Sequence, residues 1–161
     1  MTTPRHSVIP RTMCFILYND ELLMMKAGKE KSYAGKYEPV GGHIEKGEGI
    51  IESANREIQE ETGLTPGDTK LKGIVHVTNF FGKDVMMFVT LSHVRTNTVE
   101  KNKEAEELRW VKVHELDTLP TLEDMKPLIQ RVLRLRNTEM LSGVTEFDTK
   151  NRLTTLRLHV F

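Results

Sequence analysis

The chain has 161 residues and a formal net charge of zero at pH 7, because 23 Lys and Arg balance 23 Asp and Glu. This length is typical of one domain with its own core, and we expect a single domain over residues 1–161. Without an overall positive charge, neither a nucleic-acid polymer nor an anionic membrane is expected as a stable partner.

Cysteine usage and hydropathy indicate a cytoplasmic protein. The only cysteine, Cys14, lies in an apolar run, so no internal disulfide can form and a buried thiol is expected. No run approaches the ~18 apolar residues of a membrane span, and residues 1–11 lack the apolar stretch of a signal peptide. We therefore expect a soluble protein in the reducing cytoplasm.

The first half of the chain is expected to form three strands followed by a helix. The expected strands cover residues 11–18, 22–26 and 36–40. Between the first two, the segment Asn19-Asp20-Glu21 is typical of a hairpin turn. The helix is expected to begin near Gly49 and to end at Gly63, since glycine commonly follows the last turn of a helix.

The second half is expected to contribute further strands and a second helix. The expected elements are strands over 73–81, 85–94 and 108–113, a helix over 123–136, and a terminal hairpin or added strand within 144–161. Pro127 is compatible with the second helix only in its first turn, because proline lacks the backbone N–H that later turns need. Strands around two helices predict an α+β, or mixed α/β, fold.

Three glutamates of the first helix stand at spacings that bring them together. Glu57, Glu60 and Glu61 occupy positions i, i+3 and i+4, which share one face of an α-helix. Like charges repel at these spacings, so a positive charge is expected between them. Mg²⁺ takes carboxylate, water and phosphate oxygens as ligands, which indicates a magnesium–phosphate site. The alternative is a solvated, acidic helix surface.

The residues around the three acids favour the metal site. Gly41 and Gly42 precede the helix, and their lack of a side chain lets a ligand approach the backbone closely. An apolar stripe of the same helix consists of Ile51, Ala54 and Ile58. Glu57 and Glu61 lie beside this stripe, at the rim of the core. The sequence has no calcium-binding loop and no zinc-binding histidine spacing.

The segment from Gly42 to Leu64 resembles the signature box of the Nudix hydrolases. Gly42 is followed after five residues by Glu48, and after seven more by the run Arg56-Glu57-Ile58-Gln59-Glu60-Glu61-Thr62-Gly63-Leu64. Every defining position of that box is present within residues 42–64. The resemblance implies the α/β/α sandwich of that family, with a central mixed sheet, and a hydrolase that cleaves phosphoanhydride bonds of nucleotides.

The same resemblance implies a set of functional residues. Those expected to take part in catalysis are Glu48, Arg56, Glu57, Glu60, Glu61 and Glu104. Glu57, Glu60 and Glu61, with the carbonyl group of Gly42, would hold Mg²⁺, for which Mn²⁺ can substitute. Glu104 is the favoured candidate for a further acid from a loop outside the box, and a merely solvated loop is the alternative. Family members are often dimers, so a homodimer stays open.

Beyond the box, the chain is similar to the MutT-like branch, which sanitises oxidised purine nucleoside triphosphates. The similar stretch runs from Glu107 to Met125. The positions expected to bind the nucleotide are Thr12, Lys26, Glu38, Glu123 and Asp124. We therefore expect a Mg²⁺-dependent enzyme that converts a nucleotide such as 8-oxo-dGTP into the monophosphate and pyrophosphate.

Two departures from that branch keep other substrates open. Glu38 stands where an asparagine is common, and Thr121 stands where a tryptophan is common. The alternatives are a dinucleoside polyphosphate, ADP-ribose, the 5′ end of RNA or, with no turnover, a Nudix-fold binding module. Glu123 and Asp124 would also suit the first turn of the following helix, because its dipole favours acids there.

Overall fold

The computed structural model describes residues 3–100 and 105–161, and these form an eight-stranded mixed sheet. The strands are β1 Ile9–Tyr18, β2 Glu21–Ala27, β3 Tyr37–His43, β4 Lys70–Phe80, β5 Lys83–His93, β6 Ala105–Lys112, β7 Leu141–Phe147 and β8 Leu153–Val160. Their order in the sheet is β6-β2-β3-β1-β5-β4-β7-β8. The pairs β1–β5 and β4–β7 are parallel, and the other pairs are antiparallel.

Each strand that the sequence predicts is present, with small changes at its ends. The terminal segment forms a full hairpin, because β7 pairs with β8 and also joins the sheet beside β4. A short 3-10 helix, η1 Val113–Thr118, follows β6 and was not expected. No helix in residues 3–100 and 105–161 is long and apolar enough to cross a membrane.

The first helix, α1 Ile50–Thr62, lies between the two glycines that the sequence predicts as its ends. Gly63 has a left-handed φ of 73°, and its N–H donates to the carbonyl of Gln59, which closes the last turn. The second helix, α2 Met125–Leu133, is shorter than expected and begins just before Pro127. The proline is therefore in the first turn, where its missing N–H has no intrahelical partner to lose.

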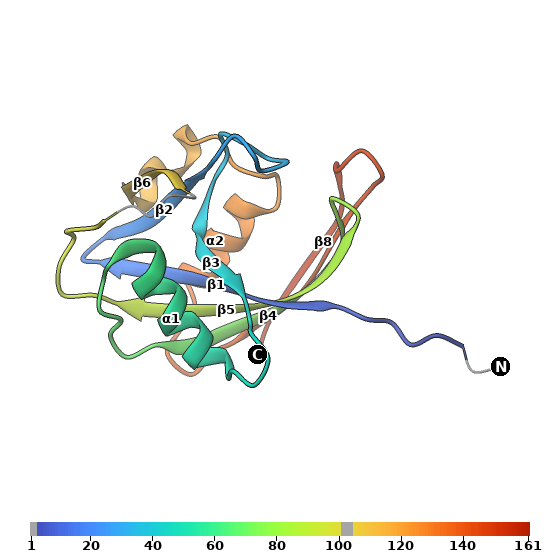
Figure 1. Ribbon diagram of the computed structural model, residues 1–161, viewed down its shortest axis with the longest axis horizontal. Coiled ribbons are helices and arrows are strands. Elements are labelled where there is room, and N and C mark those ends of the chain that lie inside the picture. Colours follow the sequence, from blue (N-terminus) through green and yellow to red (C-terminus); the bar gives the residue numbers. More distant parts are fainter. Residues whose placement is uncertain (1–2, 101–104) are drawn as a thin grey trace.

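The two helices cover opposite faces of the sheet, which gives the expected α/β/α sandwich (Figure 1). Neighbouring side chains of a strand point to opposite faces. Met13 and Phe15 of β1 accordingly pack in the core beneath α2, with Ile129. Cys14 and Ile16 pack in the second core beneath α1. One alternating strand thus supplies both cores, so β1 fixes the position of each helix relative to the other.

Two hairpin tips lie side by side at one end of the sheet (Figure 1). The β4–β5 turn consists of Phe81 and Gly82, whose φ angles of 47° and 78° are both positive, as a two-residue type I′ turn requires. The N–H of Phe81 donates to Oδ1 of Asn151 at 2.8 Å, in the β7–β8 turn. The second hairpin therefore fixes the tip of the first.

The close pairing of β1 with β3 predicts a specific stability effect at Gly41. A Cβ atom at this position would collide with the backbone carbonyl of Thr12, because Gly41 pairs with Met13 across the two strands. We expect Gly41→Ala to lower the free energy of unfolding by about 1–3 kcal/mol, measured by urea denaturation. The control is Gly49→Ala, where the nearest atom to a Cβ is 3.9 Å away. An equally small effect of both changes would contradict the prediction.

Candidate active site

Arg56 holds together the acids that α1 carries. Its Nε and Nη2 atoms donate to the two carboxylate oxygens of Glu48 at 2.6 and 3.0 Å, a bidentate pair. Its Nη1 atom donates to Glu57 at 2.9 Å and to Glu60 at 3.1 Å. Nη2 also donates to the carbonyl of His43, at the end of β3. One guanidinium thus connects the helix, the preceding loop and the sheet.

The three acids of the helix line one cleft together with Gly42. Glu57 and Glu61 are buried, whereas 59% of the Glu60 side chain is exposed. A Cβ atom on Gly42 would collide with the carboxylate of Glu57, so the absence of a side chain there gives this acid its place. The structure therefore brings Gly42, Glu57, Glu60 and Glu61 to one site, as the sequence predicts.

The donors in this cleft suit a hard divalent cation, because carboxylate and carbonyl oxygens are its preferred ligands. In the part of the chain that the structure describes, no three acid or histidine side chains converge closely enough to form a ligand set. The guanidinium of Arg56 lies instead between Glu57 and Glu60. Arg56 thus relieves part of the repulsion between these acids, which the sequence analysis expected a bound metal ion to relieve. Because Glu60 is largely exposed, its carboxylate can turn toward a cation at little cost.

Burial and ion pairing act in opposite directions on these acids. Hydrogen bonds from Arg56 lower the pKa of Glu48 to about 2, so this carboxylate is ionised at neutral pH. Burial raises the pKa of Glu57, although Arg56 opposes the shift. Glu48 therefore forms a fixed pair with the arginine, whereas the ionised form of Glu57 would gain from a second positive charge.

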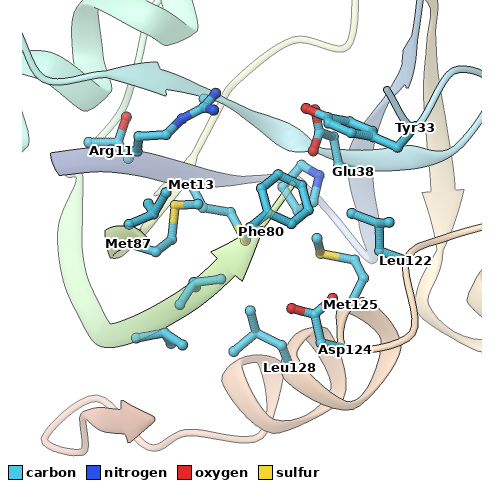
Figure 2. A pocket seen from close by; sticks show the side chains of 16 residues that line it. Arg11, Met13, Tyr33, Glu38, Phe80, Met87, Leu122, Asp124, Met125 and Leu128 are labelled. Atoms are coloured by element: carbon cyan, nitrogen blue, oxygen red, sulfur yellow. The ribbon is translucent and has the colours of Figure 1, made fainter. Parts of the chain in front are cut away.

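A second, largely apolar pocket adjoins the acid-lined cleft. Figure 2 shows Glu38 and Tyr33 together on one side and Asp124, the residue just before α2, at its foot, with Phe80 between them. Apolar side chains make up most of the remaining wall, and those of Met13, Met87, Leu122, Met125 and Leu128 are labelled. Such a pocket, apolar with a few converging polar groups, is typical of a ligand site.

Two carboxyl groups line this pocket, that of Asp124 buried and that of Glu38 half-buried. Glu38 accepts a hydrogen bond of 3.0 Å from the hydroxyl of Tyr33, and burial raises the pKa of Glu38. Burial also raises the pKa of Asp124, to about 6. The Oδ1 atom of Asp124 has no hydrogen-bond partner among the described residues. A buried, unpaired oxygen is costly, so it indicates a place where a ligand can donate a hydrogen bond.

The structure does not bring every predicted substrate residue to this pocket. Thr12 lines it, and its hydroxyl donates a long hydrogen bond of 3.5 Å to the carbonyl of Gly42. Lys26 lines neither cavity and pairs with Glu106 at 3.4 Å. Glu123 is exposed and accepts a bond from the N–H of Leu153. Glu104 lies outside the described residues.

Sequence reasoning missed several residues that line the cleft. Arg11, Lys31 and Lys83 bring positive charge to it from β1, the β2–β3 loop and the start of β5. They are far apart in the sequence and belong to no motif, so only the strand pairing reveals that they converge. The sequence offers one local indication, which is that the charged residue Arg11 stands at the start of an apolar run.

The site agrees with what the chain resembles among known proteins. The family model described as the NUDIX domain matches residues 8–132. The chain therefore belongs to the Nudix family of hydrolases. The matched region contains the acid cluster and the residues that line both cavities, and the terminal hairpin lies beyond it.

Individual relatives differ in what they act on. The ADP-ribose pyrophosphatase of Methanocaldococcus jannaschii is 28% identical over 127 residues, which are 76% of this chain and 72% of that protein. The asymmetrical bis(5′-nucleosyl)-tetraphosphatase of Sus scrofa is 32% identical over 97 residues, 57% of this chain and 66% of that protein. The crystal structure of the mutator MutT protein of Bacillus halodurans has a TM-score of 0.80 and 28% identity, covering 94% and 97% of the two chains.

The shared role of Arg56 predicts that its shape matters as well as its charge. Lysine keeps the charge but cannot form the bidentate pair with Glu48 while bonding Glu57 and Glu60. We expect Arg56→Lys to lower the free energy of unfolding by about 1–3 kcal/mol in urea. The control is Arg136→Lys, which alters an ion pair between Glu139 and the exposed side chain of Arg136. It should change the free energy of unfolding by less than about 0.5 kcal/mol. A reversed ranking would contradict the assigned role of Arg56.

The buried carboxyl of Asp124 predicts a pH-dependent stability. Its folded-state pKa of about 6 lies above the ordinary value of 3.8, so the folded state binds its proton more tightly than the unfolded state. This contribution is complete below pH 3.8 and is lost as the pH rises through about 6. Asp124→Asn should therefore gain stability relative to wild type between pH 4 and 8, by on the order of 3 kcal/mol.

The matched control for this pH series is Asp148→Asn. Hydrogen bonds from Arg152 and Lys150 lower the pKa of Asp148, so its contribution is present at neutral pH and is lost in acid. The difference between this variant and wild type should change with pH in the opposite direction. If the free energies of unfolding of Asp124→Asn and wild type differ by the same amount at every pH, the raised pKa of Asp124 is refuted.

Proposed function

We propose that the chain is a Mg²⁺-dependent nucleoside triphosphate pyrophosphohydrolase that prefers oxidised purine nucleotides such as 8-oxo-dGTP. The observation that carries this proposal is the junction of an acid-lined cleft with an apolar pocket that contains the carboxyl groups of Glu38 and Asp124. The cleft suits the charged phosphates, and the pocket suits a flat base. The similarity to the MutT protein of Bacillus halodurans along nearly the whole chain supports this choice of substrate class.

The pocket carboxyl groups suit the edge of a purine. An ionised carboxylate accepts hydrogen bonds from ring N–H and amino groups, and its protonated form donates to a carbonyl oxygen. Because the pKa of Asp124 is raised to about 6, both forms of this group are accessible near neutral pH. Oxidation of a purine at C8 adds one carbonyl and one N–H group, which a pair of such carboxyl groups can bind.

The residues of the cleft would act on the phosphates. When bound, Mg²⁺ would neutralise phosphate charge and activate a water molecule. Glu57, Glu60 and Glu61 would hold the ion, and Arg56 keeps two of these acids in place. Hydrolysis joins a water oxygen to phosphorus and breaks the bond from that phosphorus to the bridging oxygen. The products are the nucleoside monophosphate and pyrophosphate.

A substrate panel with magnesium distinguishes this proposal from other Nudix reactions. The panel contains 8-oxo-dGTP, dGTP, a dinucleoside tetraphosphate, ADP-ribose and an RNA with a 5′ triphosphate. We expect the highest kcat/KM with 8-oxo-dGTP and the release of pyrophosphate. A higher value with ADP-ribose or the dinucleoside tetraphosphate would replace the proposed substrate with that of the corresponding relative.

Glu60→Gln tests the proposed metal ligands. Even a residue that only supports a metal ligand typically contributes 10- to 100-fold, so we expect kcat to fall by roughly 100-fold or more. Glu52→Gln is the control, because Glu52 is on the same helix but accepts a bond from the N–H of Gly49 and does not line the cleft. The control should stay within about threefold of wild type. Unchanged turnover in Glu60→Gln would remove Glu60 from the ligand set.

A further inference from the structure

Five residues line both the acid-lined cleft and the apolar pocket. They are Arg11, Tyr33, Gly41, Phe80 and Val85. Of these shared residues, Arg11 is the one that carries a charge. It lies on β1 on the same face as Met13 and is paired across the strands with His43 of β3, and its side chain lies on the wall of the pocket (Figure 2). Its guanidinium therefore lies where the two cavities meet.

Arg11 has unused hydrogen-bonding capacity. Its Nε atom is buried and has no hydrogen-bond partner among the described residues. No carboxylate of the described residues forms an ion pair with Arg11. Arg56, in contrast, makes five hydrogen bonds. A buried donor without an acceptor is destabilising, so this position favours an acceptor from a ligand.

Pairing with Glu38 does not explain this arginine. The charge of Arg11 does lower the pKa of Glu38 against the effect of burial. However, Glu38 accepts its hydrogen bond from the hydroxyl of Tyr33 rather than from Arg11. The arginine is near enough to influence the carboxyl group electrostatically, but its donors stay available to a ligand.

We propose that Arg11 binds the α-phosphate of the nucleotide and so connects base recognition to the reacting phosphates. This inference rests on the proposed function, because it needs the base in the apolar pocket and the terminal phosphates at the acids. In a nucleoside triphosphate the sugar and α-phosphate lie between these two ends. A guanidinium at the junction of the cavities meets the α-phosphate with planar N–H donors that match phosphate oxygens.

The test compares two ligands that differ only in the α-phosphate, 8-oxo-dGMP and 8-oxo-deoxyguanosine. Their affinities are measured by calorimetry in EDTA, for wild type, Arg11→Gln, Arg11→Lys and the control Arg95→Gln, which removes a guanidinium from an exposed loop. Wild type should prefer the monophosphate. In Arg11→Gln this preference should fall by roughly 10- to 100-fold, since charge-assisted hydrogen bonds are lost, while nucleoside affinity stays within about twofold.

Arg11→Lys should keep part of the preference, and Arg95→Gln should keep all of it. The inference is overturned if Arg11→Gln weakens both ligands equally, which would make Arg11 a base contact, or if it weakens neither. A wild type that binds neither ligand would instead sink the purine proposal. The same comparison is then made with AMP and adenosine, and an unchanged phosphate preference in Arg11→Gln would overturn the inference there.

Discussion

The active site depends on relieving the repulsion between carboxylates that share one face of α1. A helix places Glu57, Glu60 and Glu61 together whatever their charges, so the surrounding structure must supply the compensation. Arg56 supplies part of it by bonding two of them, and its own position is fixed by the bidentate pair with Glu48. Repulsion that the arginine does not relieve remains at Glu57, because burial raises the pKa of this acid despite the arginine. In the proposed function, a divalent cation shared with phosphate oxygens would relieve that repulsion.

The sheet places the two halves of the site against each other. The acids belong to the helix on one face, and the apolar pocket lies toward the helix on the other face. They meet where β1 begins and β3 ends, beside the tip of the β4–β5 hairpin. Gly41 is essential to this junction, because it lets the two strands approach closely. In the proposed function, one nucleotide would span from a base pocket to a phosphate cleft at this end of the two strands, with Arg11 between them.

Local sequence patterns predicted the helix and its acids well, because the relevant interactions are one turn apart. The glycines at both ends of α1 follow from the backbone geometry of helix ends. The shared face of Glu57, Glu60 and Glu61 follows from helix periodicity. Long-range pairing places two of the predicted substrate residues, Lys26 and Glu123, outside the cavities. Lys26 finds Glu106 in a neighbouring strand and does not reach the cleft, and Glu123 turns toward β8. The arginine and lysines that do line the cleft come from separate elements, and no local pattern marks them.

The account's central claim is that the acid face of α1 binds a divalent cation together with a polyphosphate. Its most direct test is a titration of the protein with Mn²⁺, followed by electron paramagnetic resonance, in the presence of a non-hydrolysable nucleoside triphosphate analogue. We predict saturable uptake of Mn²⁺ that Mg²⁺ reverses and that a double Glu57→Gln and Glu60→Gln variant lacks. Equal Mn²⁺ binding by wild type and the double variant, or none by either, would contradict the claim.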